Sequence, residues 1–117
     1  MASTPIYKFV GQSFALDCGT AVSGPVTVTG TETQTMAFIN STLTSAAVTM
    51  TSLNAMSAPD GFIFPVSGAP SVVSCFILPP LMEMPIVVVV PNGGFNVWGI
   101  GQTAMPTIQM TRCEIQS

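Results

Sequence analysis

Residues 86–100 read Ile-Val-Val-Val-Val-Pro-Asn-Gly-Gly-Phe-Asn-Val-Trp-Gly-Ile, and this stretch decides the fold class. The run 86–90 is apolar and rich in β-branched residues, and it has the length of a buried strand. The pair Asn92-Gly93 accepts positive φ at both central positions of a tight turn. The stretch therefore predicts a β-hairpin whose return strand covers residues 95–100.

Strand signals recur along the rest of the chain. Segments 26–29 and 46–53 alternate apolar and hydroxyl side chains, and segment 72–78 is almost continuously apolar, which places it in the middle of the core. No window has a helical period, and ten glycines and ten prolines interrupt the chain. The pattern predicts an all-β fold, an antiparallel β-sandwich or small jelly-roll-like barrel of about eight strands. The remaining predicted strands are 35–40, 62–64 and 107–115.

Residues 1–25 have a different character from the rest of the chain. They are irregular and mixed polar, and the aromatic residues Tyr7, Phe9 and Phe14 are spread through them. We interpret this segment as an N-terminal arm or edge extension, followed by a single β-sandwich domain over residues 26–117. On this interpretation, removal of residues 1–20 leaves the sandwich folded.

The charge composition excludes whole classes of partner. Charged residues make up 6% of the chain, and the basic ones number two, Lys8 and Arg112. Two cations cannot neutralise a run of phosphates, so we expect no nucleic-acid partner.

Prolines interrupt every long apolar stretch, so we expect no membrane-spanning helix. The N-terminus lacks the pattern of a signal peptide, which predicts a protein that is made and kept in a cytosol and that stays there or is released with an assembly.

The chain is also poor in groups for catalysis. It has no histidine, so its hydroxyls and thiols lack the usual activating base. The carboxylates fall in turns or between prolines, which is typical of solubility and turn formation. Cys18, Cys75 and Cys113 do not have the spacing of a zinc site or a disulfide framework, and we expect all three to be buried. A Cys18–Cys75 or Cys75–Cys113 bridge stays open. We predict a protein that is not an enzyme and has no metal or cofactor.

The scarcity of charge indicates that much of the surface is covered in the working state. Monomeric surfaces are commonly about a quarter to a third charged. We therefore expect contacts with sister subunits, with another protein, or with both, in a homo-oligomer for which a trimer is favoured. The candidate interface residues are Ile6, Tyr7, Phe9, Phe14, Trp98 and Arg112.

Several features together resemble small bacteriophage head accessory proteins. They are the stretch Thr-Met-Ala-Phe-Ile-Asn-Ser-Thr at 35–42, the Val-rich run 86–90, the glycine turn 92–94, and the segment 95–101 that ends in Gly-Ile-Gly. The resemblance covers about residues 26–103. It implies a β-sandwich virion component of the decoration, cement or minor capsid type.

The leading hypothesis is a structural virion protein that binds the outer surface of a capsid. Its partner would be the major capsid protein or another virion protein, and it would clamp adjacent shell subunits. The net charge of −3 argues against a position facing packaged DNA. One alternative is a tail or connector component. The other is a carbohydrate-binding host-recognition module that uses Trp98 with Asn92, Asn96 and Gln102.

Overall fold

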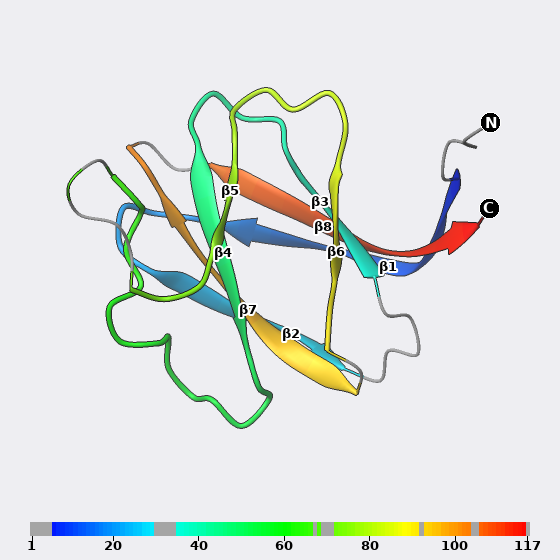
Figure 1. The fold of residues 1–117 in the computed structure, drawn as a ribbon, viewed down its shortest axis with the longest axis horizontal. Helices are drawn as coiled ribbons and strands as arrows, with labels where there is room; N and C mark the ends of the chain where they lie inside the picture. The colour runs from blue at the N-terminus through cyan, green and yellow to red at the C-terminus, as the bar shows by residue number, and fades with distance from the viewer. Residues whose placement is uncertain are drawn as a thin grey trace.

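The residues that the structure describes form eight β-strands, and Figure 1 shows how these strands are arranged in space. The structure is a computed structural model that describes residues 6–29, 35–66, 68, 72–91, 93–103 and 106–116. The side chains of residues 6–8, 10–12 and 114–116 are not described. The strands are β1 (Ile6–Asp17), β2 (Ser23–Thr29), β3 (Thr35–Asn40), β4 (Ala46–Thr51), β5 (Phe76–Leu78), β6 (Ile86–Val89), β7 (Gly94–Gly101) and β8 (Thr107–Gln116).

The strands form two four-stranded antiparallel sheets. Sheet A has the order β1-β8-β3-β6, and sheet B has the order β2-β7-β4-β5. Every neighbouring pair is antiparallel. This order is that of a double-sheet jelly roll, in which the first and last strands are neighbours. The predicted eight-stranded antiparallel sandwich is therefore confirmed.

The predicted hairpin over residues 86–100 is wrong. β6 pairs with β3 in sheet A, whereas β7 pairs with β2 and β4 in sheet B. The chain between them crosses from one sheet to the other, and Gly93 and Gly94 both have positive φ. A side chain at Gly94 would lie 2.7 Å from Leu53 Cδ1 and 2.9 Å from the Val28 carbonyl oxygen. A turn that contains glycines is therefore found where the chain crosses between two sheets as well as in a hairpin. Asn92 lies outside the described residues.

The prediction of a core strand over residues 72–78 is also wrong in part. The strand β5 contains three residues and lies at the edge of sheet B. Val72 is 86% exposed. Phe62 is buried, although residues 62–64 do not form a strand. An apolar run therefore predicts burial of some of its side chains here, but not a central strand.

The described part of the N-terminal segment is an edge strand of the sandwich. β1 pairs with β8 along its length, with an irregularity between Phe9 and Ser13. Residue 26, at the predicted domain start, lies inside β2. Leu16 and Cys18 are buried in the core between the sheets. Removal of residues 1–20 would take away a strand and part of the core, so the structure leads us to expect that this truncation destabilises the sandwich.

The main core lies between the two sheets and is built from alternate strand positions. The rings of Phe38 and Phe76 meet edge to face, with their centroids 5.2 Å apart. Such pairs contribute about 0.5–1.5 kcal/mol beyond their burial. The largest fully buried apolar side chains are Phe38, Phe95, Met36, Leu78, Ile108, Met110, Val28, Val48 and Val97.

A second apolar cluster lies on the outer face of sheet B. Trp98 and Ile100 of β7 and Ala47 of β4 pack there against Phe62, which belongs to the long segment 52–75 between β4 and β5. The described residues of this segment, 52–66, 68 and 72–75, therefore cover the middle of sheet B as a third layer. As a result, β7 is buried on both faces, which explains why its sequence is nearly continuous in apolar residues.

Buried polar side chains of sheet B hold this covering segment in place. Asn96 Nδ2 donates to the carbonyl oxygens of Ala55 at 2.9 Å and Ser52 at 3.3 Å. Thr49 Oγ1 donates to the carbonyl oxygen of Ser74 at 2.7 Å. These bonds satisfy backbone groups of the segment on the sheet, so its polar backbone can lie over an apolar cluster.

Gly99 provides a test of the packing between the sheets. A Cβ at this position would lie 2.6 Å from Cys18 Sγ and 2.9 Å from Leu16 Cδ2. We therefore expect Gly99→Ala to lower the free energy of unfolding by about 1–3 kcal/mol through overpacking. Urea denaturation followed by circular dichroism measures the change.

The matched control is Gly99→Ala combined with Cys18→Ala. Because the second substitution removes the closest atom, we expect the double variant to be more stable than the sum of the two single effects. Strict additivity of the two effects would contradict this account of the packing.

Candidate functional site: the outer face of sheet A

The outer face of sheet A is the candidate interaction face of this protein. One row of residues crosses all four strands in register, from Phe9 through Cys113 and Thr35 to Val89. Directly opposed residues on antiparallel strands share a face. Val88 packs against the core between the sheets. Because successive side chains of a strand point to opposite faces, the row lies on the side away from sheet B.

Two further rows continue this face. The hydroxyl groups of Ser13 and Thr111 are hydrogen-bonded across β1 and β8 at 2.9 Å. The second row consists of Ser13, Thr111, Ala37 and Val87, and the third consists of Ala15, Gln109 and Ile39. These three rows are called the sheet A face below. They contain apolar, hydroxyl, thiol and amide side chains and no charged group.

Charged residues occupy other positions of the same strands. Lys8 is opposite Glu114 in register, and both alternate with the positions of the sheet A face. Arg112 alternates with them in the same way. Asp17 ends β1 beyond the third row, where its carboxylate accepts a 2.8 Å hydrogen bond from Thr107 Oγ1. Because Asp17 alternates in step with Ser13 and Ala15, its carboxylate lies on the same side in the next row, at the end of sheet A; the three rows of the sheet A face themselves contain no charged residue.

Two large apolar side chains on this face are strongly exposed. Val89 is 74% exposed and Phe9 is 59% exposed. They lie at the two ends of one row that spans the width of the sheet. A wide sheet surface with exposed apolar side chains and no charge is typical of a surface that contacts another protein.

The four edge strands are protected against strand addition. β2 contains Pro25, β5 has three residues and is followed by Pro79, and β6 lies between Pro85 and Pro91. The pairing of β1 is broken by its irregularity. Prolines, short strands and bulges all weaken pairing at a sheet edge. Contacts with a partner are therefore expected through a face rather than through an edge.

The predicted interface residues of the N-terminal segment divide between the surface and the core. Phe9 lies on the sheet A face, whereas Phe14 packs against the core between the sheets. Ile6 and Tyr7 lie in β1, opposite Gln116 and Ile115. For these two residues only the backbone is described.

Trp98 and Arg112 make contacts within the chain. Trp98 is 4% exposed, and its Nε1 donates a 2.8 Å hydrogen bond to Thr51 Oγ1. Arg112 Nη2 donates to the carbonyl oxygen of Thr29 at 2.6 Å, and its Nε is buried without a hydrogen-bond partner in the described chain. The tryptophan ring therefore does not lie at the surface, where the sequence analysis placed it.

The residues expected for sugar binding do not form an exposed group with Trp98. Asn96 is buried and accepts a 2.7 Å hydrogen bond from Thr27 Oγ1 in addition to holding the covering segment. Gln102 is exposed, and Asn92 lies outside the described residues. The structure thus gives Asn96 and Trp98 a different role, that of anchors for the third layer.

Most of the residues of the sheet A face were not predicted from the sequence. Val87 and Val89 belong to a run that reads as continuously buried, and Thr35 and Ala37 alternate with core residues. The missing signal was which side of each strand faces sheet B, which depends on the strand order.

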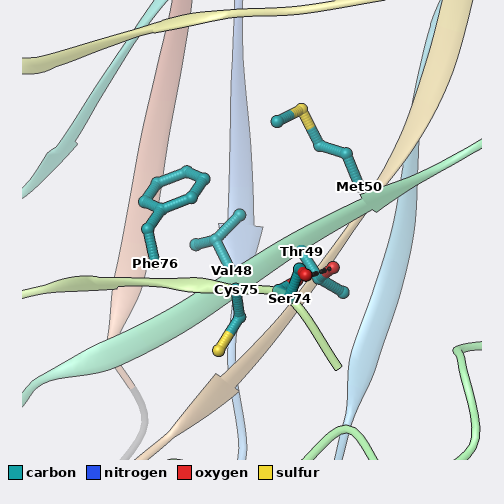
Figure 2. A pocket seen from close by; sticks show the side chains of 6 residues that line it. All are labelled: Val48, Thr49, Met50, Ser74, Cys75 and Phe76. Carbon is teal, nitrogen blue, oxygen red and sulfur yellow. Dashed lines mark hydrogen bonds between the residues drawn. The ribbon is translucent and has the colours of Figure 1, made fainter. Parts of the chain in front are cut away.

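A pocket of about 320 Å³ lies where β5 begins beside β4. Figure 2 shows Val48, Met50 and Phe76 on one side of the strands and Cys75 on the other. No charged side chain lines it. The pocket therefore offers apolar packing but no charged group for binding or catalysis.

The cysteines are free thiols in the structure. Cys18 and Cys113 are buried, as expected, whereas Cys75 is half-buried. Burial raises the pKa of the Cys18 thiol to about 11, with a smaller contribution from the negative charge of Asp17. Burial also raises the pKa of Cys75. Both thiols therefore stay protonated at neutral pH, a form that is weakly nucleophilic.

The described residues contain no group of three or more side chains that could hold a metal ion. No helix among these residues is long and apolar enough to cross a membrane.

The buried Cys18 thiol predicts a loss of stability at alkaline pH. In the unfolded chain this thiol ionises near pH 9, whereas the folded chain keeps it protonated until about pH 11. Its contribution is therefore fully present below pH 9 and is lost as the pH rises toward 11. We expect the free energy of unfolding to fall by about 2 kcal/mol between about pH 8 and about pH 11. Urea titrations at several pH values measure this fall.

The control for this prediction is Cys18→Ala, which is less stable at every pH but has no thiol to ionise. We expect its stability to change less over the same pH range. An identical pH profile for the variant and the unchanged protein would contradict the assignment to Cys18.

Comparisons with protein-family models, with curated proteins and with solved structures found no match for this chain.

Proposed function

We propose that this protein is a structural virion component that docks through the sheet A face onto the outer surface of a capsid and clamps adjacent shell subunits. The observation that carries the proposal is the charge-free sheet A face, with Val89 and Phe9 exposed at its two ends. Permanent protein interfaces are built from surfaces of this kind.

Two further observations support the setting of a virion. The resemblance to small phage head accessory proteins covers about residues 26–103. The strand order is that of a jelly roll, an architecture that recurs in viral capsid domains and also in lectins. The second argument is an analogy of fold, so the proposal depends mainly on the surface.

The proposed oligomer is a closed assembly of a few copies, with a trimer favoured. The protected edges of the sheets do not favour open-ended strand addition. A closed oligomer would cover apolar surface, and the low charge of the chain leaves much of its surface suited to such burial.

A single charge on the sheet A face tests the proposal. We expect Val89→Lys to reduce attachment to shells at least tenfold, because docking would bury an unpaired ammonium group. Val89 is largely exposed, so the variant is expected to melt within a few degrees of the unchanged protein. The measurement is the number of copies bound per particle after addition of purified protein to shells that lack it.

The matched control is Val72→Lys, which makes the same substitution at an exposed position of the segment over sheet B. We expect it to bind shells normally. Equal binding by the two variants would contradict the assignment of the sheet A face. If the unchanged protein does not bind shells at all, the proposed function itself is wrong.

A further inference from the structure

Two connections lie side by side at one end of the sandwich, as Figure 1 shows. They are residues 41–45, between β3 and β4, and residues 79–85, between β5 and β6. Leu81 N donates to the Thr42 carbonyl oxygen, and Met82 N donates to the Asn40 carbonyl oxygen, both at 2.9 Å. These two connections are called the tip below.

The buried side chain of Asn40 forms hydrogen bonds that hold the backbone of the tip in place. It is fully buried, and its Nδ2 donates to the carbonyl oxygens of Thr44 at 2.7 Å and Leu78 at 3.2 Å. Its Oδ1 accepts hydrogen bonds from the backbone N of Thr42, at 3.1 Å, and from the Thr42 hydroxyl. The buried amide thus joins the 41–45 connection to the end of β5, and the Asn40 carbonyl oxygen holds Met82 of the 79–85 connection, so the tip is a preorganised platform.

This platform presents large apolar side chains to solvent. Leu43 is 79% exposed, Met84 is 75% exposed and Leu81 is 60% exposed. Leu81 also has a φ of 54°, in the left-handed region that glycine and asparagine occupy far more easily than leucine. An exposed leucine with an unfavourable backbone does not serve the stability of the fold. Backbone strain of this kind is found at functional sites.

The charges at this end of the molecule are all acidic. Glu83 is an exposed residue of the tip, and Asp17 lies at the same end, where β1 finishes. The two basic residues of the chain, Lys8 and Arg112, lie toward the opposite ends of β1 and β8. A complementary surface must therefore combine apolar contact with positive charge.

We propose that the tip is a second docking site, whose occupant is an apolar pocket on the shell protein bordered by a lysine or arginine that pairs with Glu83. This inference rests on the proposed function, because it takes the partner to be a virion protein. A second copy of the chain is a poorer match, because its sequence offers two basic residues and one of them, Arg112, already donates to the Thr29 carbonyl oxygen. An anionic bilayer would repel Glu83 and Asp17.

The test replaces the apolar surface of the tip without changing its backbone. The variant is Leu43→Ser with Leu81→Asn and Met84→Gln, in which asparagine tolerates the left-handed conformation at position 81. We expect its occupancy on shells to fall at least tenfold, while its melting temperature stays within a few degrees of the unchanged protein. The measurement is the number of copies per particle, by quantitative mass spectrometry, on shells of the encoding virus produced without this protein.

The matched control changes three exposed side chains of the segment over sheet B, by Met56→Gln, Val66→Ser and Val72→Ser. We expect it to occupy shells normally. Full occupancy by the tip variant would overturn the inference and leave the proposed function intact. Failure of the unchanged protein to bind shells would instead overturn the proposed function, and with it the partner assigned to the tip.

The charge and the identity of the occupant are tested separately. We expect Glu83→Lys to reduce occupancy more than Glu83→Gln, because only the lysine repels a basic border. A photo-crosslinking amino acid placed at position 43 is expected to join the tip to a shell-protein peptide that contains a lysine or arginine. Crosslinks only to lipid, or only to a second copy of this chain, would overturn the inference.

Discussion

The packing of residues 52–66 and 72–75 over the outer face of sheet B is the constraint on which the rest of the structure depends. Trp98 and Ile100 would be exposed on that face without it, and the buried Asn96 side chain would lose its carbonyl partners in the segment. The segment turns a two-layer sandwich into three layers on one side. The middle strands of sheet B, β4 and β7, are thereby covered on both faces within a single chain, whereas Phe9 and Val89 stay exposed on the outer face of sheet A.

Because of this asymmetry, the two outer faces of the sandwich differ in the surface they offer to a partner. The sheet A face carries no charge, and the edges of both sheets are protected by prolines, short strands or an irregular pairing. The surface suited to a partner therefore spans all four strands of sheet A, and it lies on the side opposite the covering segment. The tip, with Leu43, Leu81 and Met84, lies at one end of the sandwich. A protein with a docking face and a projecting end is suited to contact two neighbouring subunits at once.

The sequence predicted the fold class because alternation and turn residues are local signals, and seven of the eight strands overlap predicted segments. It could not predict the sheet crossing after Val90, because a hairpin and a crossing both use positive-φ glycines. It could not predict the face of Val89 or the burial of Trp98, because both depend on strand order and on a loop distant in sequence. Phe9 was predicted at the surface from its place in an irregular segment, and it is exposed.

The most direct test of the central claim is an electron cryomicroscopy reconstruction of particles that carry this protein. The account predicts that Val87, Val89 and Phe9 face the shell and that the segment over sheet B points away from it. A reconstruction in which sheet A is open to solvent while residues 52–75 contact the shell would contradict the account.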